Sequence, residues 1–230
     1  MGLKATIKRI IGFLGKCMYI KTLLFKDKAR STLQSFSPKP IGTCCTKNTL
    51  NLKYDLQIII PCYNVEKWVK QCLESVLNQQ TKYNVLVSIV NDGSTDGTED
   101  IIRSVMTQYK FPEVIGGGYT LELKTQKNRG FSGARNAALK GIKGTYVMFL
   151  DSDDVIIDGA IDKMLDVAFE ENAEILQGGW YEFNEAGDRE ERRINKLSGF
   201  PWGKLYKSNV MEYFQFPEDF WFEDTPLSFI

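Results

Sequence analysis

Residues 85–97 read VLVSIVNDGSTDG, an apolar and β-branched run followed directly by small and polar residues. The run predicts a buried strand over 85–90, and the Asn, Asp, Gly and Ser that follow predict a turn. Residues 98–109 then place Ile101, Ile102 and Val105 on one face of a predicted helix. A strand that leads through a tight turn into a helix is the repeating unit of a parallel sheet.

The same alternation extends in both directions from this stretch. Strands are predicted over 56–60, 119–123 and 146–150 and from 174 to 177, and helices over 66–78, 132–142 and 160–169. The pattern predicts an α/β fold with a mostly parallel, Rossmann-like sheet and helices on both faces. In such sheets ligands bind at the carboxyl ends of the strands. The residues directly after each strand are therefore the candidates for function.

The charge is distributed unevenly between two predicted regions, 1–54 and 55–230. Residues 1–54 contain eleven Lys and Arg and one acid, Asp27, so they carry +10 and the rest of the chain carries −10. Bulky apolar residues recur at helical spacing among the lysines of 1–30, which predicts a basic amphipathic helix, with a linker over 31–54. This helix either lies on an anionic membrane face or is a solvated or packed helix. The acidic domain argues against nucleic-acid binding.

The absence of histidine restricts the possible chemistry. Ser-His-Asp and Cys-His catalysis are excluded, so proton transfer near neutral pH falls to Asp, Glu, Cys, Tyr or Lys. A bound metal would need mainly oxygen ligands, which favours Mg²⁺ or Mn²⁺. The five cysteines are odd in number and form no C-x-x-C, so neither a disulfide framework nor a zinc site is indicated. Reduced thiols are typical of a cytoplasmic protein.

Two polar segments follow the first two predicted strands. In the first, residues 60–64 (IPCYN), Pro61 ends the strand and Tyr63 can stack on a base or bond a ribose, although a packed turn tyrosine is an alternative. In the second, Gly93 and Gly97 allow a tight turn close to a ligand. Turn chemistry explains these glycines but not Asp92, whose carboxylate can accept hydrogen bonds from a base or ribose.

Two further segments suit a diphosphate and its metal. Residues 128–136 (NRGFSGARN) open a predicted helix whose start, near Ser132, favours an anion; Arg135 adds charge-assisted bonds or else pairs with an acid. In FLDSDD, Asp151, Asp153 and Asp154 follow a predicted strand. Such a cluster is either a metal site, with Asp151 and Asp153 on the same side of extended chain, or a helix cap.

A last acidic pair lies among aromatic residues. Glu223 and Asp224 occur in residues 221–226, WFEDTP. Aromatic surroundings predict partly buried carboxylates with raised pKa values, which suit a general base; a helix cap before Pro226 is the alternative. Upstream, residues 203–206 (GKLY), which follow Trp202, either line an acceptor site or begin a packed helix.

Taken together, IIIPCYN, VNDGSTDGT, NRGFSGARNAAL, FLDSDD and WFEDTP resemble the motifs of glycosyltransferase family 2, which has a GT-A fold. The resemblance covers about residues 56–230 and implies an inverting, metal-dependent enzyme. Such an enzyme moves a sugar from a nucleotide-diphosphate sugar, often a UDP-sugar, to a hydroxyl of a glycan or glycolipid in surface polysaccharide or glycolipid assembly.

The resemblance also implies roles for individual residues. Pro61, Tyr63 and Asp92 match positions that contact the nucleoside. The D-x-D segment that holds ribose and Mn²⁺ or Mg²⁺ is matched by Asp151 and Asp153, with Asp154 sharing the metal. Asp224 matches the catalytic base, with Glu223 beside it. Arg135 and the helix start at Ser132 are expected to help bind the donor's diphosphate.

The chain departs from the family pattern in two places. Asn91 replaces the first of two paired acids, and the chain ends at Ile230, where relatives commonly continue. The acceptor side of 55–230 is therefore expected to be incomplete, which leaves a non-catalytic nucleotide-sugar-binding scaffold as the alternative. A nucleotidyltransferase, which would release pyrophosphate in place of UDP, is a third possibility.

Overall fold

The computed structural model describes residues 47–109, 117–183, 189–192 and 199–218. The predicted amphipathic helix at 1–30 and the acidic pair Glu223–Asp224 lie outside these residues. Within the described ranges, no helix has both the length and the apolar character needed to cross a bilayer.

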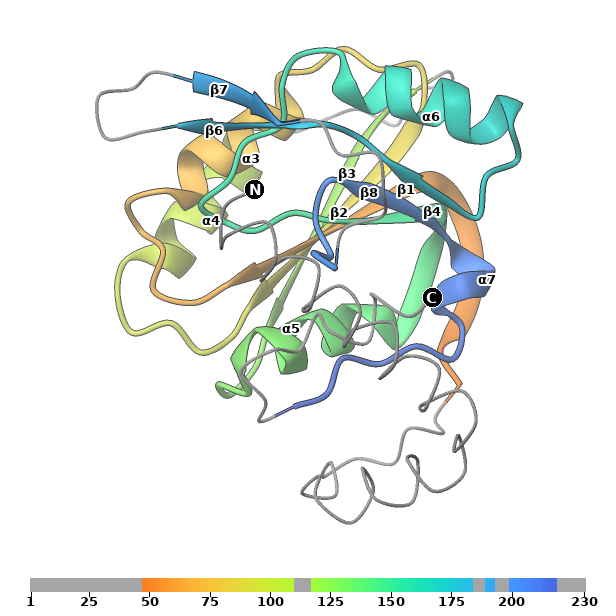
Figure 1. Ribbon diagram of the computed structural model, residues 1–230. Coiled ribbons are helices and arrows are strands. Elements are labelled where there is room, and N and C mark those ends of the chain that lie inside the picture. Colours follow the sequence, from red (N-terminus) through yellow and green to blue (C-terminus); the bar gives the residue numbers. More distant parts are fainter. Residues whose placement is uncertain (1–46, 110–116, 184–188, 193–198, 219–230) are drawn as a thin grey trace, which may run out of the picture. The chain divides into compact units, whose positions relative to one another are not determined.

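A six-stranded sheet in the order β3-β2-β1-β4-β8-β5 forms the centre of the domain (Figure 1). Four long strands are parallel to one another: β1 (Thr49–Cys62), β2 (Asn84–Asn91), β3 (Gly118–Thr125) and β4 (Gly141–Phe149). Two short strands complete the sheet: β8 (Lys204–Lys207), antiparallel to both of its neighbours, and β5 (Ile175–Gln177). The predicted α/β fold with a mostly parallel sheet is confirmed.

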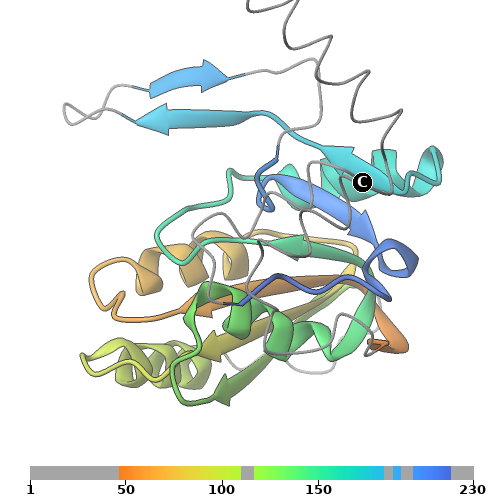
Figure 2. The same ribbon diagram turned by 60° about the horizontal axis from the view of Figure 1, so that its bottom comes forward.

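Helices cover both faces of this sheet. One face carries α3 (Val69–Leu77), α4 (Thr98–Gln108) and α6 (Ala160–Glu170), and the other carries α5 (Gly130–Leu139) and the short α7 (Ser208–Met211). Figures 1 and 2 show α5 and α6 on opposite sides of the strands. A separate hairpin of β6 (Trp180–Phe183) and β7 (Arg189–Arg192) projects away from the sheet.

The two faces divide the side chains of the central strands between two cores. In β1, Leu56, Ile58 and Ile60 pack with α3, α4 and α6, whereas Ile59 packs with α5. All four side chains are fully buried. Because both faces are covered, the strand is apolar at consecutive positions, which is the pattern that predicted a buried parallel strand.

Three boundaries differ from the sequence-based expectation. Strand β1 begins at Thr49, so 49–54 of the expected linker belong to the sheet. The helix expected over 132–142 is α5, which ends at Leu139, and β4 begins at Gly141. A Cβ at Gly144 would lie 2.4 Å from the backbone nitrogen of Gln57, so this glycine permits the close approach of β1 and β4. Residues 204–207 form strand β8 and do not begin a helix.

Candidate functional site

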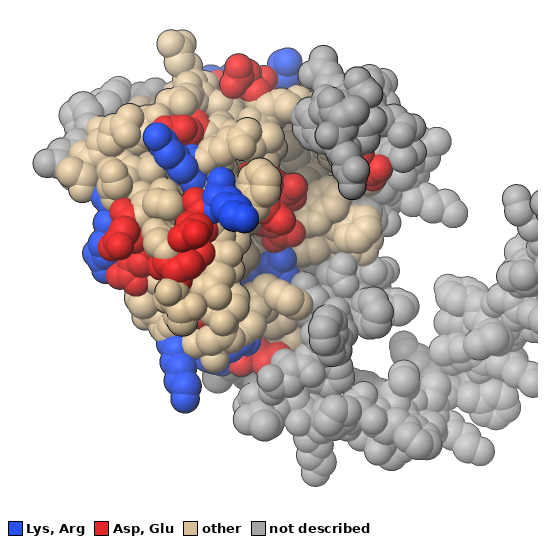
Figure 3. Space-filling model, turned by 90° about the vertical axis from the view of Figure 1, so that its left-hand side faces the viewer, with Lys and Arg blue, Asp and Glu red and all other residues tan. Residues whose placement is uncertain are grey.

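A cavity of about 520 Å³ lies at the carboxyl ends of the parallel strands, next to the start of α5. Four of the predicted segments line it, and the lining residues are Pro61, Cys62, Tyr63, Val65, Asp92, Asn128, Gly130, Phe131, Ala134, Arg135, Asp151, Ser152 and Asp153. Figure 3 views the side to which the arrowheads of the parallel strands point in Figure 1, and acidic side chains gather there with a few basic ones among them. We refer to this cavity as the strand-end cavity.

Tyr63 stands at the edge of the strand-end cavity and is 49% exposed. The turn that presents it is held by Asn64, which has a φ of 52° and whose Oδ1 accepts a hydrogen bond from the Thr95 N–H at 2.8 Å. Asn is among the few residues that tolerate this left-handed conformation. The loop after β1 is thereby tied to the loop after β2, and the Tyr63 ring is left accessible for stacking.

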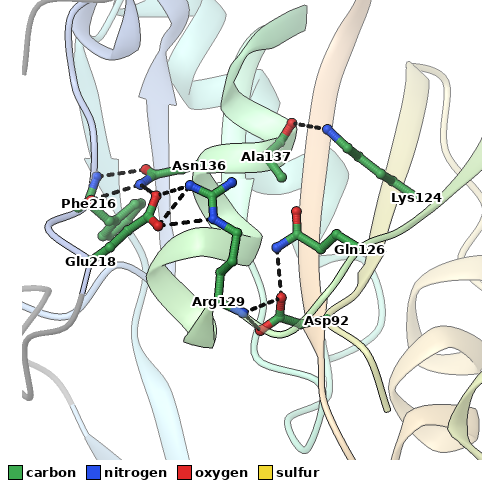
Figure 4. Close-up of polar contacts among 8 residues, drawn as sticks. All are labelled: Asp92, Lys124, Gln126, Arg129, Asn136, Ala137, Phe216 and Glu218. Atoms are coloured by element: carbon green, nitrogen blue, oxygen red, sulfur yellow. Dashed lines mark hydrogen bonds and ion pairs between the residues drawn. The ribbon is translucent and has the colours of Figure 1, made fainter. Parts of the chain in front are cut away.

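Asp92 has a structural role that the sequence did not suggest. It is 1% exposed, and its carboxylate accepts hydrogen bonds from Gln126 Nε2 at 2.7 Å and from the backbone N–H of Arg129 at 3.0 Å (Figure 4). These bonds order the loop between β3 and α5. A carboxylate offers about four acceptor positions, so Asp92 retains capacity for a ligand in the strand-end cavity.

The neighbours of Asp92 explain why Asn91 replaces an acid. Asn91 is buried, donates through Nδ2 to Glu99 Oε2 at 2.6 Å and accepts from the Ser94 N–H at 3.1 Å. An amide can do both, whereas an ionised carboxylate here could not donate and would face the carboxylate of Glu99. Of the two glycines expected to meet a ligand, Gly93 has φ +73° and lies against the backbone of 126–128, and Gly97 donates its N–H to Glu66. Neither glycine lines the strand-end cavity.

Arg135 lies within α5 and is almost fully buried, at 4% exposure. Its guanidinium donates to Asp151 Oδ1 at 2.7 Å and lies over the rings of Phe131 and Phe216, 5.7 and 5.3 Å from their centroids. The pairing with an acid, left open by the sequence, is therefore present, and Arg135 also lines the strand-end cavity. The buried Ser132 does not line it, so the part of the helix start at the cavity is Gly130 and Phe131.

The acidic segment after β4 is a turn, whereas extended chain was expected. The Asp154 N–H donates to the Asp151 carbonyl at 3.0 Å. Asp151 and Asp153 still face the same cavity, but Asp154 does not: it lines a second cavity on the other side of the turn. Burial and the nearby carboxylates of Asp151 and Asp153 raise the pKa of Asp154 to about 6. Three acids in one turn therefore repel one another, as the sequence suggested.

The carboxylates in the strand-end cavity suit a metal that is shared with a ligand. In the described part of the chain, the Asp153 carboxylate makes no hydrogen bond or ion pair, whereas Asp151 is engaged by Arg135. No group of three or more acidic or cysteine side chains able to hold a metal occurs among the described residues. One or two carboxylates are nevertheless sufficient for Mg²⁺ when phosphate oxygens and water complete the shell. Asp153 is the best placed ligand for such an ion, followed by Asp151.

The two described cysteines do not contribute a nucleophile or base. Burial raises the pKa of Cys62 to about 12 and that of Cys72 still further. Cys72 Sγ lies 3.6 Å from the Asp151 carbonyl oxygen, and both thiols pack beneath the acidic turn. Thiols in such surroundings stay protonated at neutral pH.

The C-terminal part of the described chain is fastened to α5 by contacts that the sequence analysis missed (Figure 4). Asn136 and Phe216 exchange two hydrogen bonds of 2.8 Å between the Asn136 amide and the Phe216 backbone. Arg129 forms a bidentate ion pair with Glu218, through Nη2 at 2.5 Å and Nε at 3.1 Å. Arg129 thus binds Asp92 through its backbone and Glu218 through its side chain. No local sequence signal identifies a pair separated by 89 residues.

Comparisons with known proteins agree with this geometry. The family model described as "Glycosyl transferase family 2" matches residues 57–224. The chain is 32% identical over 187 residues to Glycosyltransferase GlyA of Streptococcus pneumoniae, and 33% identical over 129 residues to the minor teichoic acid biosynthesis protein GgaB of Bacillus subtilis. A crystal structure of S. aureus TarS with UDP superposes with a TM-score of 0.62 at 26% identity.

These similarities cover parts of larger proteins. The alignment with GlyA takes in 70% of this chain but 25% of GlyA, and the alignment with GgaB takes in 56% of this chain and 13% of GgaB. The TarS superposition covers 76% of this chain and 54% of the TarS chain. The stretch matched by the family model, residues 57–224, holds the strand-end cavity and the acidic turn.

Proposed function

Because this chain belongs to glycosyl transferase family 2, we propose that it carries the donor-binding and catalytic site of an inverting glycosyltransferase. The proposed donor is a UDP-sugar and the acceptor a hydroxyl of a glycan or glycolipid. One observation carries the proposal. A single cavity at the strand ends combines an accessible aromatic ring at Tyr63, a buried carboxylate at Asp92, a guanidinium at Arg135 and the unengaged carboxylate of Asp153.

These four groups suit the parts of a nucleotide-diphosphate sugar. The Tyr63 ring offers a stacking surface for a base, and Asp92 offers acceptor positions for base or ribose donors. Arg135, which is paired with Asp151, would provide positive charge near the diphosphate. The structure of TarS with UDP supports UDP as the nucleotide.

The acidic turn supplies a place for Mn²⁺ or Mg²⁺ beside the diphosphate. Asp153 would hold the ion, with Asp151 beside it. Asp154, which the sequence predicted as a third ligand, lines the other cavity and is not proposed as a ligand. When bound, a divalent ion stabilises the negative charge that develops on the departing diphosphate. The chain itself contributes the fixed carboxylate and the guanidinium that orient the leaving group.

In the proposed reaction the acceptor oxygen attacks the anomeric carbon from the face opposite the diphosphate. The bond from that carbon to the diphosphate oxygen breaks, and its electron pair leaves with UDP. Asp224 takes the proton of the attacking hydroxyl, with Glu223 beside it. This role follows from the family motif. Glu218, which is paired with Arg129, precedes Asp224 by six residues. Because six residues of extended chain span at most about 20 Å, Asp224 can lie no farther than that from Glu218.

The cellular setting is proposed from the relatives and the charge distribution. GgaB acts in minor teichoic acid biosynthesis by its name, which supports a role in surface polymer or glycolipid assembly. We place the domain in the cytoplasm, with the basic residues 1–30 in peripheral contact with an anionic membrane face. Co-sedimentation with anionic vesicles should decrease when residues 1–30 are removed, and equal sedimentation would refute this contact.

The proposed function is tested by calorimetric titration of UDP in Mn²⁺ and then in EDTA, followed by UDP release from a panel of UDP-sugars. We expect metal-dependent UDP binding, and turnover that Asp153→Ala abolishes, because that substitution removes the unengaged carboxylate. The exposed Asp158→Ala serves as the matched control, since it lies outside the strand-end cavity. Unchanged turnover in Asp153→Ala would refute the metal assignment. UDP binding without turnover of any UDP-sugar would favour a non-catalytic binding protein.

A further inference from the structure

A second cavity, of about 150 Å³, lies on the other side of the acidic turn from the strand-end cavity. Asp154 and Val155 line it from the turn, Trp180 from the start of β6, and Trp202 and Gly203 from the segment before β8. We refer to it as the tryptophan cavity. Within the lining set of described residues there is no lysine or arginine.

The two indole rings of this cavity are held in place by the fold. Trp202 forms a parallel bridge with Phe149, the last residue of β4, directly before Leu150 and the acidic turn. Its ring stacks on Phe200 with centroids 4.9 Å apart and an interplanar angle of 8°. Trp180 meets the Trp202 ring edge to face at 5.2 Å. The indoles therefore form a fixed wall beside β4.

The rest of the lining alternates apolar surface with accessible polar groups. Gly178, Gly179 and Gly203 have no side chains to shield their peptide groups, and the Gly178 N–H is already bonded to the Gly203 carbonyl at 2.9 Å. Val155 and Ile157 extend the apolar surface to the outside, at 40% and 53% exposure. Exposed apolar side chains that adjoin a cavity are typical of binding sites.

This combination matches a sugar ring. A pyranose has apolar C–H faces, which pack on aromatic rings, and a rim of hydroxyls, which donate to carboxylates and carbonyls. Asp154 supplies a carboxylate that makes no side-chain hydrogen bond or ion pair with any described residue. A carboxylate at Asp154, with no basic side chain among the described lining residues, disfavours a phosphorylated or acidic ligand.

The position of the cavity relates it to the proposed reaction. Asp153 lines the strand-end cavity and Asp154, the next residue, lines the tryptophan cavity. Only the acidic turn would therefore separate a sugar ring in the tryptophan cavity from a donor in the strand-end cavity.

We propose that the tryptophan cavity binds the sugar ring that accepts the transferred group, and that it selects an uncharged pyranose. Trp180 and Trp202 contact the C–H face of the ring, and Asp154 accepts hydrogen bonds from its hydroxyls. This inference rests on the proposed function for the role of the ring as acceptor. Its binding chemistry depends only on the cavity.

Binding is tested first without any turnover, on the whole chain with ¹⁵N-labelled tryptophan. Methyl pyranosides, and glucose 6-phosphate as the charged comparison, are titrated to about 50 mM, which detects dissociation constants in the millimolar range. We expect the indole signals of Trp180 and Trp202 to shift with an uncharged pyranoside, and those of the 53% exposed Trp68 to stay in place. No shift at Trp180 and Trp202 with any pyranoside, or equal shifts with glucose 6-phosphate, would overturn the proposal.

The acceptor role is tested second, through sugar-dependent release of UDP from a UDP-sugar. We expect Trp180→Ala to raise the KM for the pyranoside at least tenfold while the affinity for UDP changes less than twofold. Trp68→Ala, at an exposed site outside both cavities, is the matched control. An unchanged acceptor KM in Trp180→Ala would overturn the acceptor role. If the wild-type chain releases no UDP but the indole signals shift, the proposed function fails and the sugar site stands.

Discussion

The strand-end cavity and the tryptophan cavity share the acidic turn but are built in different ways. The first is formed at the ends of long parallel strands, whose side chains are buried on both faces. The second is formed around strands of three or four residues and depends on contacts between aromatic rings. Backbone hydrogen bonding between long strands therefore fixes the strand-end cavity, whereas side-chain packing shapes the tryptophan cavity.

The largest expected effect separates binding from chemistry. Asp224→Asn removes the proposed base and should lower kcat by about 100- to 10,000-fold, because that is the usual contribution of general base catalysis. Titration of UDP should show unchanged affinity, since the proposed role of Asp224 is to take a proton from the acceptor and not to contact the nucleotide. A variant with near wild-type kcat would show that another group takes the proton, and Glu223→Gln would then be the next variant to measure.

A smaller effect is expected on the donor side. Asp92→Ala removes a buried carboxylate that holds the 126–129 loop and lines the strand-end cavity. Loss of its charge-assisted bonds should weaken UDP binding about 10- to 100-fold, measured by calorimetry. Asp92→Asn, which keeps one acceptor oxygen, should lose less. If Asp92→Ala folds and binds UDP normally, the carboxylate only orders the loop.

The ion pair that fastens the C-terminal part of the described chain to the start of α5 should have a modest effect. Glu218→Gln weakens the ion pair between Arg129 and Glu218. Because the side chains of both residues are partly exposed, the pair contributes little, and kcat should fall about two- to fivefold with little change in UDP affinity. The double variant Arg129→Glu with Glu218→Arg should recover part of the loss. Lys82→Gln, which removes an exposed ion pair with Asp166, is the matched control. Failure of the double variant to improve on either single charge reversal would argue against the pairing.

The smallest effect concerns stability and pH. The pKa of Asp154 is raised from 3.8 to about 6, so the folded protein favours its neutral form. Ionisation of Asp154 therefore lowers the free energy of unfolding progressively between pH 4 and 6, and the full decrease is present above pH 6. Because the Asp154 side chain is only partly buried and remains accessible to solvent, we expect the Asp154→Asn variant in EDTA to be more stable by at most about 1 kcal/mol at pH 7, or about 2–4 °C in Tm, and no more stable at pH 4. Equal thermal midpoints at pH 7 would contradict the shift.

The parallel half of the fold was predictable because its signals are local. An uninterrupted apolar run such as 85–90 identifies a strand buried on both faces, and the polar residues after it must lie at one edge of the sheet. The sequence therefore predicted that Tyr63, Asp92, Arg135, Asp151 and Asp153 would meet, and they line one cavity.

The remaining features depend on contacts between distant residues. The helix predicted over 132–142 ends at Leu139, and Gly144 permits the close approach of β1 and β4. The sequence pattern predicted Asp154 as a metal ligand together with Asp151 and Asp153, but the turn places its side chain in the lining of the tryptophan cavity. The pairing of Arg129 with Glu218, and of Trp202 with Phe149, follows from the path of the whole chain. Local patterns carry no information on such pairs.

The exchange of hydrogen bonds between Asn136 and Phe216 has an evolutionary consequence. The chain leaves the end of β4 at Leu150 and is received by α5 at Phe216, so both attachment points lie on the parallel half of the domain. Most of the lining of the tryptophan cavity comes from residues 154–203, which lie between these two points and after Asp151 and Asp153. Under the proposed assignment, changes within 154–203 would alter the acceptor side without touching the residues that line the strand-end cavity. One segment of sequence would then diversify the acceptors while the nucleotide site is kept.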